Sequence, residues 1–368
     1  MKLTVKKDEL KGKLQQIQSC IAKSGQTPIL SHFLIQAAKD GITITGTDLT
    51  VVLKEPLAAI VSEEGSLAIP AAKCLEIVKE AEENIVLESE KGEDWLKILF
   101  GRSKYRLACL PAKEFPTFPT FEVESEMIFK NSELLDMVEK TVFCAGTDDK
   151  RYTLNGLLFH LIPGEKELAV VATDGHRLAL KTKALEVPAG EEKQIIVPRK
   201  AAVELKRILP AEGEVSVAIG KNHVLFSIGE VKFLARLIEG TYPSWKQVIP
   251  AVNGKNLIVE RTALIKGIRK AAIVTKEIGG AIILETGPSN LILSSMASEI
   301  GEAKDELTVE YVGEPIKLGV KPNYLLEAVE ALSAEKITLS FGEQTSPILI
   351  RNVGDLSDHT CVVMPVKL

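Results

Sequence analysis

The fold of this chain is decided by a helical pattern that occurs three times, as DELKGKLQQIQSCIAK (8–23), NSELLDMVEKTVFCA (131–145) and TALIKGIRKAAIVTK (262–276). In each stretch the apolar residues recur at spacings of three and four, as Leu10 and Leu14 do in the first. This spacing predicts an amphipathic helix. The copies are separated by about 125 residues, and a fixed period of this kind indicates a repeated structural unit.

The residues after each predicted helix also repeat. Runs rich in β-forming residues, interrupted by a Gly, Pro or Asp turn, predict a pair of strands in each copy. These strand pairs are expected at 30–49, 154–175 and 279–298. A second helix comes next, with proline near its start, where the fixed φ of proline suits a first helical turn. These helices are expected at 69–81, 197–209 and 320–332, and further strand hairpins close each copy.

The repeats divide the chain into three predicted domains. The boundaries fall in LPAKEFPTFPTFE (110–122) and VIPAVNGKN (248–256), because clusters of Pro and Gly favour loops. We therefore expect domains at 1–122, 123–250 and 251–368. Short connections between strands favour antiparallel pairing. The predicted class is α+β, with the two helices of each domain on one face of antiparallel sheets.

The composition indicates a globular protein, because 45% of the residues are hydrophobic and 26% are charged. No run reaches the roughly 18 apolar residues that a membrane helix needs. The start MKLTVKKDEL lacks the apolar core and cleavage site of a secretory signal, so we expect a cytoplasmic protein with no membrane partner. The five cysteines are scattered and have no zinc-site spacing, which predicts reduced, buried thiols.

The net charge of −5 argues against a nucleic-acid partner, because Lys and Arg supply the contacts to phosphate. The distribution of charge can override the total. Residues 199–207 carry four basic side chains against one acid, and 261–276 carry five against none. Each run alone is explained equally well by a solvated helix face.

Sequence signatures of catalysis are weak. The chain contains neither G-x-x-x-x-G-K-[ST], nor G-x-S-x-G, nor H-E-x-x-H. The best enzyme candidate is Thr173-Asp174-Gly175-His176-Arg177, where Asp174 and His176 could act as an acid–base pair. The first repeat contains Thr47-Asp48-Leu49 at the same place, so we interpret the Thr-Asp pair as a turn in which Asp accepts hydrogen bonds from backbone amides. The other histidines, His32, His160, His223 and His359, give no metal-ligand spacing with it.

Five motifs in order along the chain carry a resemblance: NGLLF (155–159), VATDGHRLA (171–179), VPRK (197–200), YPSWKQVIP (242–250) and VVMPVKL (362–368). Together with PILSHFLIQ and TGTDL in the first repeat, they are similar to the bacterial DNA sliding clamp, the beta subunit of DNA polymerase III. The resemblance implies a head-to-tail homodimer that forms a six-domain ring, encircles double-stranded DNA of any sequence and confers processivity in DNA replication. It implies no catalytic residue, cofactor or metal. The implied partners are the replicative polymerase, the clamp loader and repair proteins, bound through linear peptide motifs.

Cations inside such a ring would contact phosphates rather than base edges, because a sliding ring must tolerate every sequence. The candidates for DNA binding are Lys11, Lys13, Lys23, Arg199, Lys200, Lys206, Lys266, Arg269 and Lys270. The resemblance implies that the dimer interface joins the first repeat of one protomer to the third of the other. The sequence offers chemistry for this, because GRSKYRLACL (101–110) is basic, the third repeat is acidic around 299–306, and opposite charges would select orientation. The interface candidates are Arg102, Lys104, Arg106, Leu107, Ile273, Val274, Glu299, Glu302, Asp305 and Glu306. Two unrelated solvated runs are the alternative.

The resemblance also implies a hydrophobic groove for partner peptides. Its candidate residues are Leu154, Thr173, Gly175, His176, Arg177, Leu178, Pro243, Val248, Tyr324, Val362, Val363, Met364, Pro365 and Val366. The terminal CVVMPVKL is apolar to its end, which predicts that something covers it. A final core strand explains Val362 and Val363 equally well, whereas Met364 and Pro365 suit an adaptable binding surface. The chain departs from the family pattern at Thr153 and Gln247 and in Val366-Lys367, which leaves the peptide preference open.

Two other functions are consistent with parts of the sequence. An acid–base hydrolase would lose turnover when His176 is replaced by Ala, with no effect on retention of DNA. A monomeric peptide-binding adaptor would elute at the mass of a single chain, whereas a ring would elute at twice that mass.

Overall fold

The structure is a computed structural model. It describes residues 1–22, 27–89, 94–162, 166–185, 191–251, 254–275, 280–295, 301–354 and 358–367. The chain folds into two compact units. Unit 1 consists of Met1–Leu135 and Val203–Leu237, and unit 2 consists of Asp136–Ala202 and Ile238–Leu368. The predicted boundaries at 122 and 250 stay a prediction, because the second repeat contributes to both units.

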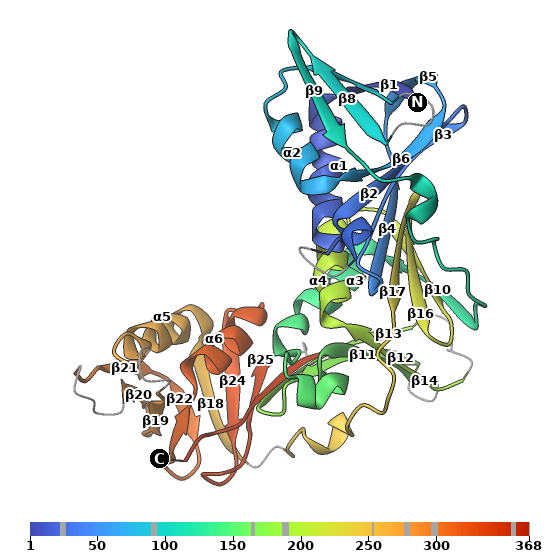
Figure 1. The fold of residues 1–368 in the computed structure, drawn as a ribbon. Coiled ribbons are helices and arrows are strands. Elements are labelled where there is room, and N and C mark those ends of the chain that lie inside the picture. The colour runs from blue at the N-terminus through green and yellow to red at the C-terminus, as the bar shows by residue number, and fades with distance from the viewer. Residues whose placement is uncertain are drawn as a thin grey trace. The chain divides into compact units, whose positions relative to one another are not determined.

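The six α-helices described are two per repeat, as expected. They are α1 (Lys7–Cys20), α2 (Ala71–Lys79), α3 (Asn131–Glu139), α4 (Arg199–Ile208), α5 (Arg261–Ala272) and α6 (Pro322–Ala331). Helix α1 packs against α2, and α5 packs against α6 (Figure 1). Short 3-10 helices occur at η1 (Pro28–Ser31), η2 (Ala112–Glu114), η3 (Val142–Cys144), η4 (Asp149–Leu154) and η5 (Trp245–Gln247).

Unit 1 contains two antiparallel sheets. In spatial order, the first has β5 (Ala59–Glu63), β1 (Lys2–Lys6), β7 (Asn84–Glu88), β8 (Trp95–Phe100) and β9 (Ser103–Ala108). The second has β10 (Ser125–Lys130), β15 (Glu214–Ile219), β16 (His223–Ile228), β17 (Val231–Arg236), β4 (Val51–Pro56), β3 (Gly41–Thr47), β2 (His32–Ala38) and β6 (Gly65–Pro70). Strands β17 and β4 join the second repeat to the first within this sheet.

Unit 2 also contains two antiparallel sheets. The larger has β14 (Lys193–Pro198), β11 (Gly156–Ile162), β12 (Glu167–Thr173), β13 (Arg177–Ala184), β26 (His359–Val363), β25 (Ile348–Asn352), β24 (Lys336–Phe341), β18 (Lys255–Glu260) and β22 (Glu310–Val312). The smaller has β21 (Lys304–Thr308), β20 (Asn290–Ser295), β19 (Ile282–Thr286) and β23 (Lys317–Val320). Strands β13 and β26 join the second repeat to the third. The predicted α+β class with antiparallel sheets is confirmed.

The strand pairing supports the threefold repeat. The strand that opens each repeat pairs with the strand after the second helix, as β1 does with β7, β10 with β15 and β18 with β24. The sequence pattern placed the start of each copy at its helix and missed these opening strands. They are short and half-buried, so their apolar residues give a weaker signal than the helices that come after them.

Three predicted helix ends are wrong. Helix α5 was expected over 262–276 but ends at Ala272. Helix α1 was expected to reach residue 23 but ends at Cys20, because Ile21 has extended backbone with φ −97° and ψ 161°. Helix α3 was expected to reach residue 145 but ends at Glu139, and η3 comes after it. The hydroxyl of Thr141 donates to the carbonyl of Met137 at 2.8 Å, a local side-chain bond that competes with helix continuation.

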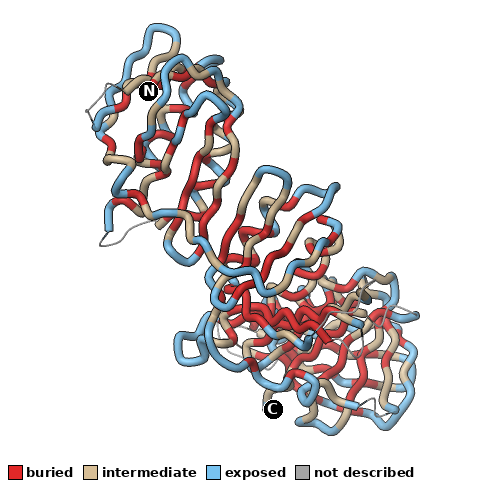
Figure 2. The backbone as a smooth tube through the Cα atoms, turned by 90° about the vertical axis from the view of Figure 1, so that its right-hand side faces the viewer, coloured by how far each residue is buried: buried red, intermediate tan, exposed pale blue. Residues whose placement is uncertain are grey.

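The core lies between helices and sheets, and buried residues follow the strands while exposed ones follow the connecting loops (Figure 2). Strands β11 and β26 are buried at every position, which indicates cover on both faces. All five cysteines are free and buried, as predicted. Burial raises the pKa of the Cys74, Cys109 and Cys361 thiols to about 12. No helix among the described residues is long and apolar enough to cross a membrane.

Candidate functional site

The Thr173–Arg177 motif forms a tight turn between β12 and β13. The Asp174 carboxylate accepts hydrogen bonds from the backbone amides of His176 and Arg177, at 2.9 and 3.0 Å. The Thr173 hydroxyl donates to the Arg177 carbonyl at 2.6 Å and accepts from the Gly175 amide at 3.1 Å. Gly175 has φ +85°, a conformation that only glycine adopts without strain. The motif is therefore a polar turn, as its counterpart in the first repeat suggested.

The first repeat contains the same turn between β3 and β4. Asp48 accepts from the amides of Thr50 and Val51 at 2.9 Å each. The Thr47 hydroxyl donates to the Val51 carbonyl at 2.8 Å, and the amide of Leu49 donates back to it at 2.9 Å. Because the two turns share their hydrogen bonds atom for atom, the prediction of a repeat-unit turn is confirmed. Asp174 also accepts from Arg177 Nε at 3.1 Å, so both oxygens of its carboxylate accept hydrogen bonds.

Arg177 connects this turn to the third repeat within unit 2. Its Nη1 donates to Glu327 on α6 at 2.6 Å, and its Nη2 donates to the Phe143 carbonyl at 2.7 Å. The guanidinium carbon lies 4.5 Å from the centre of the Tyr324 ring. The pKa of Arg177 is raised even though burial opposes this, because the carboxylates of Glu327 and Asp174 and the Cys144 side chain favour the charged form. The guanidinium of Arg177 is therefore a positive charge held in place by two carboxylates and an aromatic ring.

The other peptide-site candidates divide by accessibility. Leu154, Leu178, Val362 and Val363 are buried in the core of unit 2. For Val362 and Val363, the structure therefore favours the final core strand, β26. The accessible candidates surround this apolar core: Gly175, His176, Pro243 and Val248 are exposed, and Tyr324, Met364, Pro365 and Val366 are half-buried. His176 stacks on Tyr324 with ring centroids 6.3 Å apart, and its carbonyl accepts from the Met364 amide at 2.9 Å.

The segment 242–248 is fixed to this surface by two aromatic residues that the sequence pattern did not single out. The Tyr242 hydroxyl accepts from the Thr173 amide at 3.0 Å, and burial raises its pKa. Trp245 is 8% exposed and belongs to the same apolar cluster as Leu154, Leu178 and Val362. Aromatic residues beside a Pro in YPSWKQVIP were the available signal, but the sequence could not show which of them would be buried. Thr153 is half-buried and Gln247 is exposed.

The candidate DNA-binding cations differ in how they are paired. Lys13 pairs with the buried Glu55 at 2.7 Å, and burial raises the pKa of Glu55 while Lys13 lowers it. Arg269 pairs with Glu330 at 2.6 Å, and Lys270 pairs with Asp305 at 3.1 Å.

The exposures of these cations also differ. Arg199, Lys206, Lys266, Arg269 and Lys270 are exposed, and Lys11, Lys13 and Lys200 are half-buried. Lys23 lies outside the described residues.

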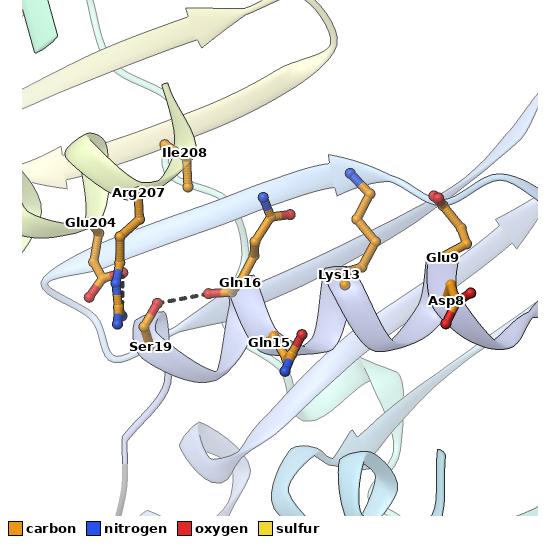
Figure 3. A pocket seen from close by; sticks show the side chains of 10 residues that line it. Asp8, Glu9, Lys13, Gln15, Gln16, Ser19, Glu204, Arg207 and Ile208 are labelled. Carbon is orange, nitrogen blue, oxygen red and sulfur yellow. Dashed lines mark hydrogen bonds and ion pairs between the residues drawn. The ribbon is translucent and has the colours of Figure 1, made fainter. Parts of the chain in front are cut away.

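A surface pocket of about 360 Å³ lies between α1 and the end of α4 in unit 1. Lys13, Gln16 and Ser19 line it from α1, and Glu204 and Arg207 line it from α4. Figure 3 shows Glu204 and Arg207 close to the Ser19 end of α1, with an ion pair of 3.6 Å between them. Arg207 is exposed and adds a cation beyond those that the sequence predicted. Among the described residues, no group of three or more His, Cys, Asp or Glu could hold a metal ion.

Half of the candidate interface residues lie on two edge strands. In the part of the chain that the structure describes, β9 pairs with β8 alone and β21 pairs with β20 alone. Strand β9 carries Lys104 and Arg106, whereas β21 carries Asp305 and Glu306. Leu107, also on β9, is half-buried. Of the candidates outside the two strands, Arg102 and Glu302 are exposed, Val274 is half-buried and Ile273 is 70% exposed. Glu299 lies outside the described residues.

Family models of the DNA polymerase III beta subunit match almost the whole chain. The N-terminal domain matches residues 1–119, the central domain 129–244 and the C-terminal domain 246–367. Beta sliding clamps from Pseudomonas putida and Caulobacter vibrioides are 31% and 32% identical, each aligned over 100% of both chains.

Solved structures agree with these matches. The DNA polymerase III subunit beta of Pseudomonas aeruginosa has a TM-score of 0.92 at 30% identity and covers 100% of both chains. The sliding clamp of Bartonella birtlesii, bound to griselimycin, has a TM-score of 0.94 at 29% identity, again over 100% of both chains. The chain therefore belongs to the DNA polymerase III beta subunit family, the bacterial DNA sliding clamps.

Proposed function

We propose that two copies of this chain form a head-to-tail ring around double-stranded DNA and confer processivity on the replicative polymerase. The observation that carries this proposal is the pair of edge strands of opposite charge, β9 and β21. An edge strand presents unpaired backbone groups that readily accept a further strand. Pairing β9 of one protomer with β21 of the other would satisfy both edges and use each surface twice. Such a head-to-tail contact closes into a dimer when the two protomers are related by a two-fold rotation, and we propose that relation here.

The charges on these strands supply orientation. Lys104 on β9 and Glu306 on β21 are both exposed, and complementary charges suppress the reversed pairing. The exposed side chain of Ile273, next to the end of α5, offers apolar area that such an interface would cover. The domain boundaries of the family models lie near 122 and 250, which supports the proposed three domains per protomer.

The proposed DNA contacts are the exposed cations of α4 and α5. Lys266, Arg269 and Lys270 share one face of α5, opposite the buried face that carries Leu264 and Ile268. Phosphate contacts of this kind hold DNA without reading its sequence. Because Lys13, Arg269 and Lys270 already have carboxylate partners, we expect weak direct affinity for DNA, and retention would depend on closure of the ring.

The proposed peptide site is the surface formed by His176, Arg177, Pro243, Val248, Tyr324 and residues 364–366. Two of the matched structures, from Pseudomonas aeruginosa and Bartonella birtlesii, are sliding clamps bound to griselimycin. An apolar floor with a few fixed polar groups suits the recognition of linear peptides. Polymerase, clamp loader and repair proteins would compete for this site. The chain would act as a cytoplasmic processivity factor with no reaction of its own.

The test of encirclement is topological. The protein is loaded onto a nicked circular plasmid with clamp loader and ATP, then passed over a sizing column at raised salt, which weakens phosphate contacts. We expect it to stay with the circle and to be lost once a single cut makes the plasmid linear. A plasmid that is linear from the start is the control. Equal retention on both forms, or loss from the intact circle at moderate salt, would contradict the proposal.

The test of the interface is the mass in solution. Wild type should run at twice the mass of one chain, and Lys104→Glu should shift it toward the monomer. Adding Glu306→Lys to the same chain restores opposite charges across the interface and should restore the dimer. If wild type runs as a monomer at micromolar concentration, the proposed ring is wrong.

A further inference from the structure

Trp245 is buried together with a histidine that the proposed function does not use. His160 lies on β11 and is 6% exposed. The Trp245 Nε1–H donates to His160 Nδ1 at 3.3 Å, and the two rings meet edge to face with centroids 6.2 Å apart. A buried indole N–H needs an acceptor, because leaving it unpaired costs its full desolvation free energy. His160 supplies that acceptor.

The second ring nitrogen of His160 is held by a carboxylate. His160 Nε2 lies 2.7 Å from Glu192 Oε1, and the Gln194 side chain lies 3.3 Å from the same nitrogen. A carboxylate only accepts, so Nε2 carries the proton and Nδ1 is the acceptor for the indole. The hydrogen bond from His160 lowers the pKa of Glu192, which keeps that carboxylate ionised. The three side chains therefore form a hydrogen-bonded chain in which Trp245 donates to His160 and His160 donates to Glu192.

This chain of bonds ends beneath the proposed peptide site. Trp245 begins η5, and the amide of Val248 donates to the Trp245 carbonyl at 3.1 Å. Pro243 and Val248, both exposed, flank this turn. The segment thus has two attachments, Tyr242 to Thr173 and Trp245 to His160, which come before and after Pro243 in the chain.

We propose that His160 is a positioning residue for the peptide site: through the Trp245 indole it fixes the segment that presents Pro243 and Val248. This inference rests on the proposed peptide site. His160 itself touches no peptide, since it is buried under Trp245. Loss of the acceptor would leave the indole N–H unpaired and allow the 3-10 turn to shift, and displacement of a binding wall weakens binding even where every contact residue is intact.

The test compares two variants of His160 in a Trp95→Phe background, so that Trp245 is the only tryptophan left. His160→Asn places an amide oxygen near the position of Nδ1 and keeps the acceptor. His160→Leu fills the space without an acceptor. The probe is griselimycin, measured by calorimetry, and the second readout is the emission and near-UV circular dichroism of Trp245. Thermal unfolding shows that each variant is folded.

We expect His160→Leu to weaken griselimycin binding about tenfold and to change the Trp245 spectra. His160→Asn should stay within about threefold of the parent and keep its spectra. In a Trp245→Phe chain, which has no indole donor, the Asn and Leu variants should bind alike. That result would attribute the effect to the hydrogen bond and exclude a general loss of packing.

The two proposals fail in different ways. If the parent protein does not bind griselimycin, the peptide site is wrong, while the Trp245 spectra still decide whether His160 positions the indole. If the parent binds and His160→Leu binds equally well with unchanged spectra, the role proposed for His160 is overturned. Equal weakening by the Asn and Leu variants would also overturn it, because the acceptor would then not matter.

Discussion

The turn at Thr47–Val51 in unit 1 and the turn at Thr173–Arg177 in unit 2 have the same backbone and different surroundings. Both use a Thr hydroxyl and an Asp carboxylate to hold the amides of the turn. At the third position one has Leu49 with φ +73° and the other Gly175 with φ +85°. Leu49 is 61% exposed, whereas the second turn continues into His176 and Arg177. Both repeats therefore form the same turn, and in the proposed peptide site the function of the second turn depends on the two residues that come next in the chain.

The difference lies in the side chains of the second turn. Arg177 reaches Glu327 and Tyr324 from the third repeat, and His176 stacks on Tyr324. The first turn ends in Val51, which is fully buried. If the proposed peptide site is right, a repeated unit acquires a binding surface by changing two residues after a shared hydrogen-bond pattern. Three experiments test this difference between the turns.

The largest change in stability should come from lowering the pH, because a buried histidine, His359, lies in the sheet that carries the second turn. Strand β13 pairs with β26, where burial, reinforced by the positive charges of Lys140 and Lys181, lowers the pKa of His359 to about 4. Between pH 6.5 and 4 the unfolded chain binds a proton that the folded chain does not. Stability is therefore full above pH 6.5 and falls as the pH drops toward 4, by up to about 3 kcal/mol.

Urea unfolding of wild type and His359→Gln at pH 7 and pH 4.5 checks this. The glutamine amide can still donate to the Lys140 carbonyl, which lies 3.2 Å from His359 Nε2, but it does not titrate. The variant should lose less stability on acidification than wild type does. Equal losses in both proteins would show that His359 does not determine the acid sensitivity.

A smaller effect should come from removing the carboxylate of each turn. Asp48→Ala deletes two amide hydrogen bonds and should cost about 1 kcal/mol. Asp174→Ala deletes the equivalent bonds and the pair with Arg177, and should cost about 2 kcal/mol. Asp174→Ala alone should weaken griselimycin binding, because Arg177 and His176 lose their support. If Asp48→Ala weakens binding as much, the two turns do not differ in function as proposed.

Substitution at the third position of each turn should have the least effect. Gly175→Ala places a side chain on left-handed backbone, and its Cβ would lie 2.4 Å from Arg151 Nη1, so we expect a loss of about 1 kcal/mol. Leu49→Gly relieves the same strain but adds freedom to the unfolded chain, so its stability should change by less than about 0.5 kcal/mol. Thermal denaturation measures both. A Gly175→Ala protein as stable as wild type would indicate that the turn adapts.

The sequence predicted much of the fold because its signals are local. Apolar spacing placed the first helix of each repeat, and proline near the first turn placed the second. The parallel between Thr47-Asp48 and Thr173-Asp174 predicted a turn without any knowledge of the structure. The ends of α1, α3 and α5 were missed, since side-chain bonds such as that of Thr141 after α3 compete with a helix over a few residues. The opening strands β1, β10 and β18 were missed because pairing with a distant strand, and not their own pattern, makes them strands.

The candidate site was only partly accessible to the same reasoning. Motifs identified the Thr173–Arg177 turn and the apolar C-terminus, but the structure was needed to show that Val362 and Val363 belong to the core and that Trp245 rests on His160. Charge runs in the sequence indicated basic helices, and the structure paired Lys13 with Glu55 and Lys270 with Asp305. Periodicity and turn chemistry act between neighbours in the chain, so the amino-acid sequence was sufficient to define the repeat, its helices and its Thr-Asp turn. Burial, side-chain pairing and the sheet that joins β13 to β26 depend on residues far apart in the chain, so they are defined only once the chain has folded.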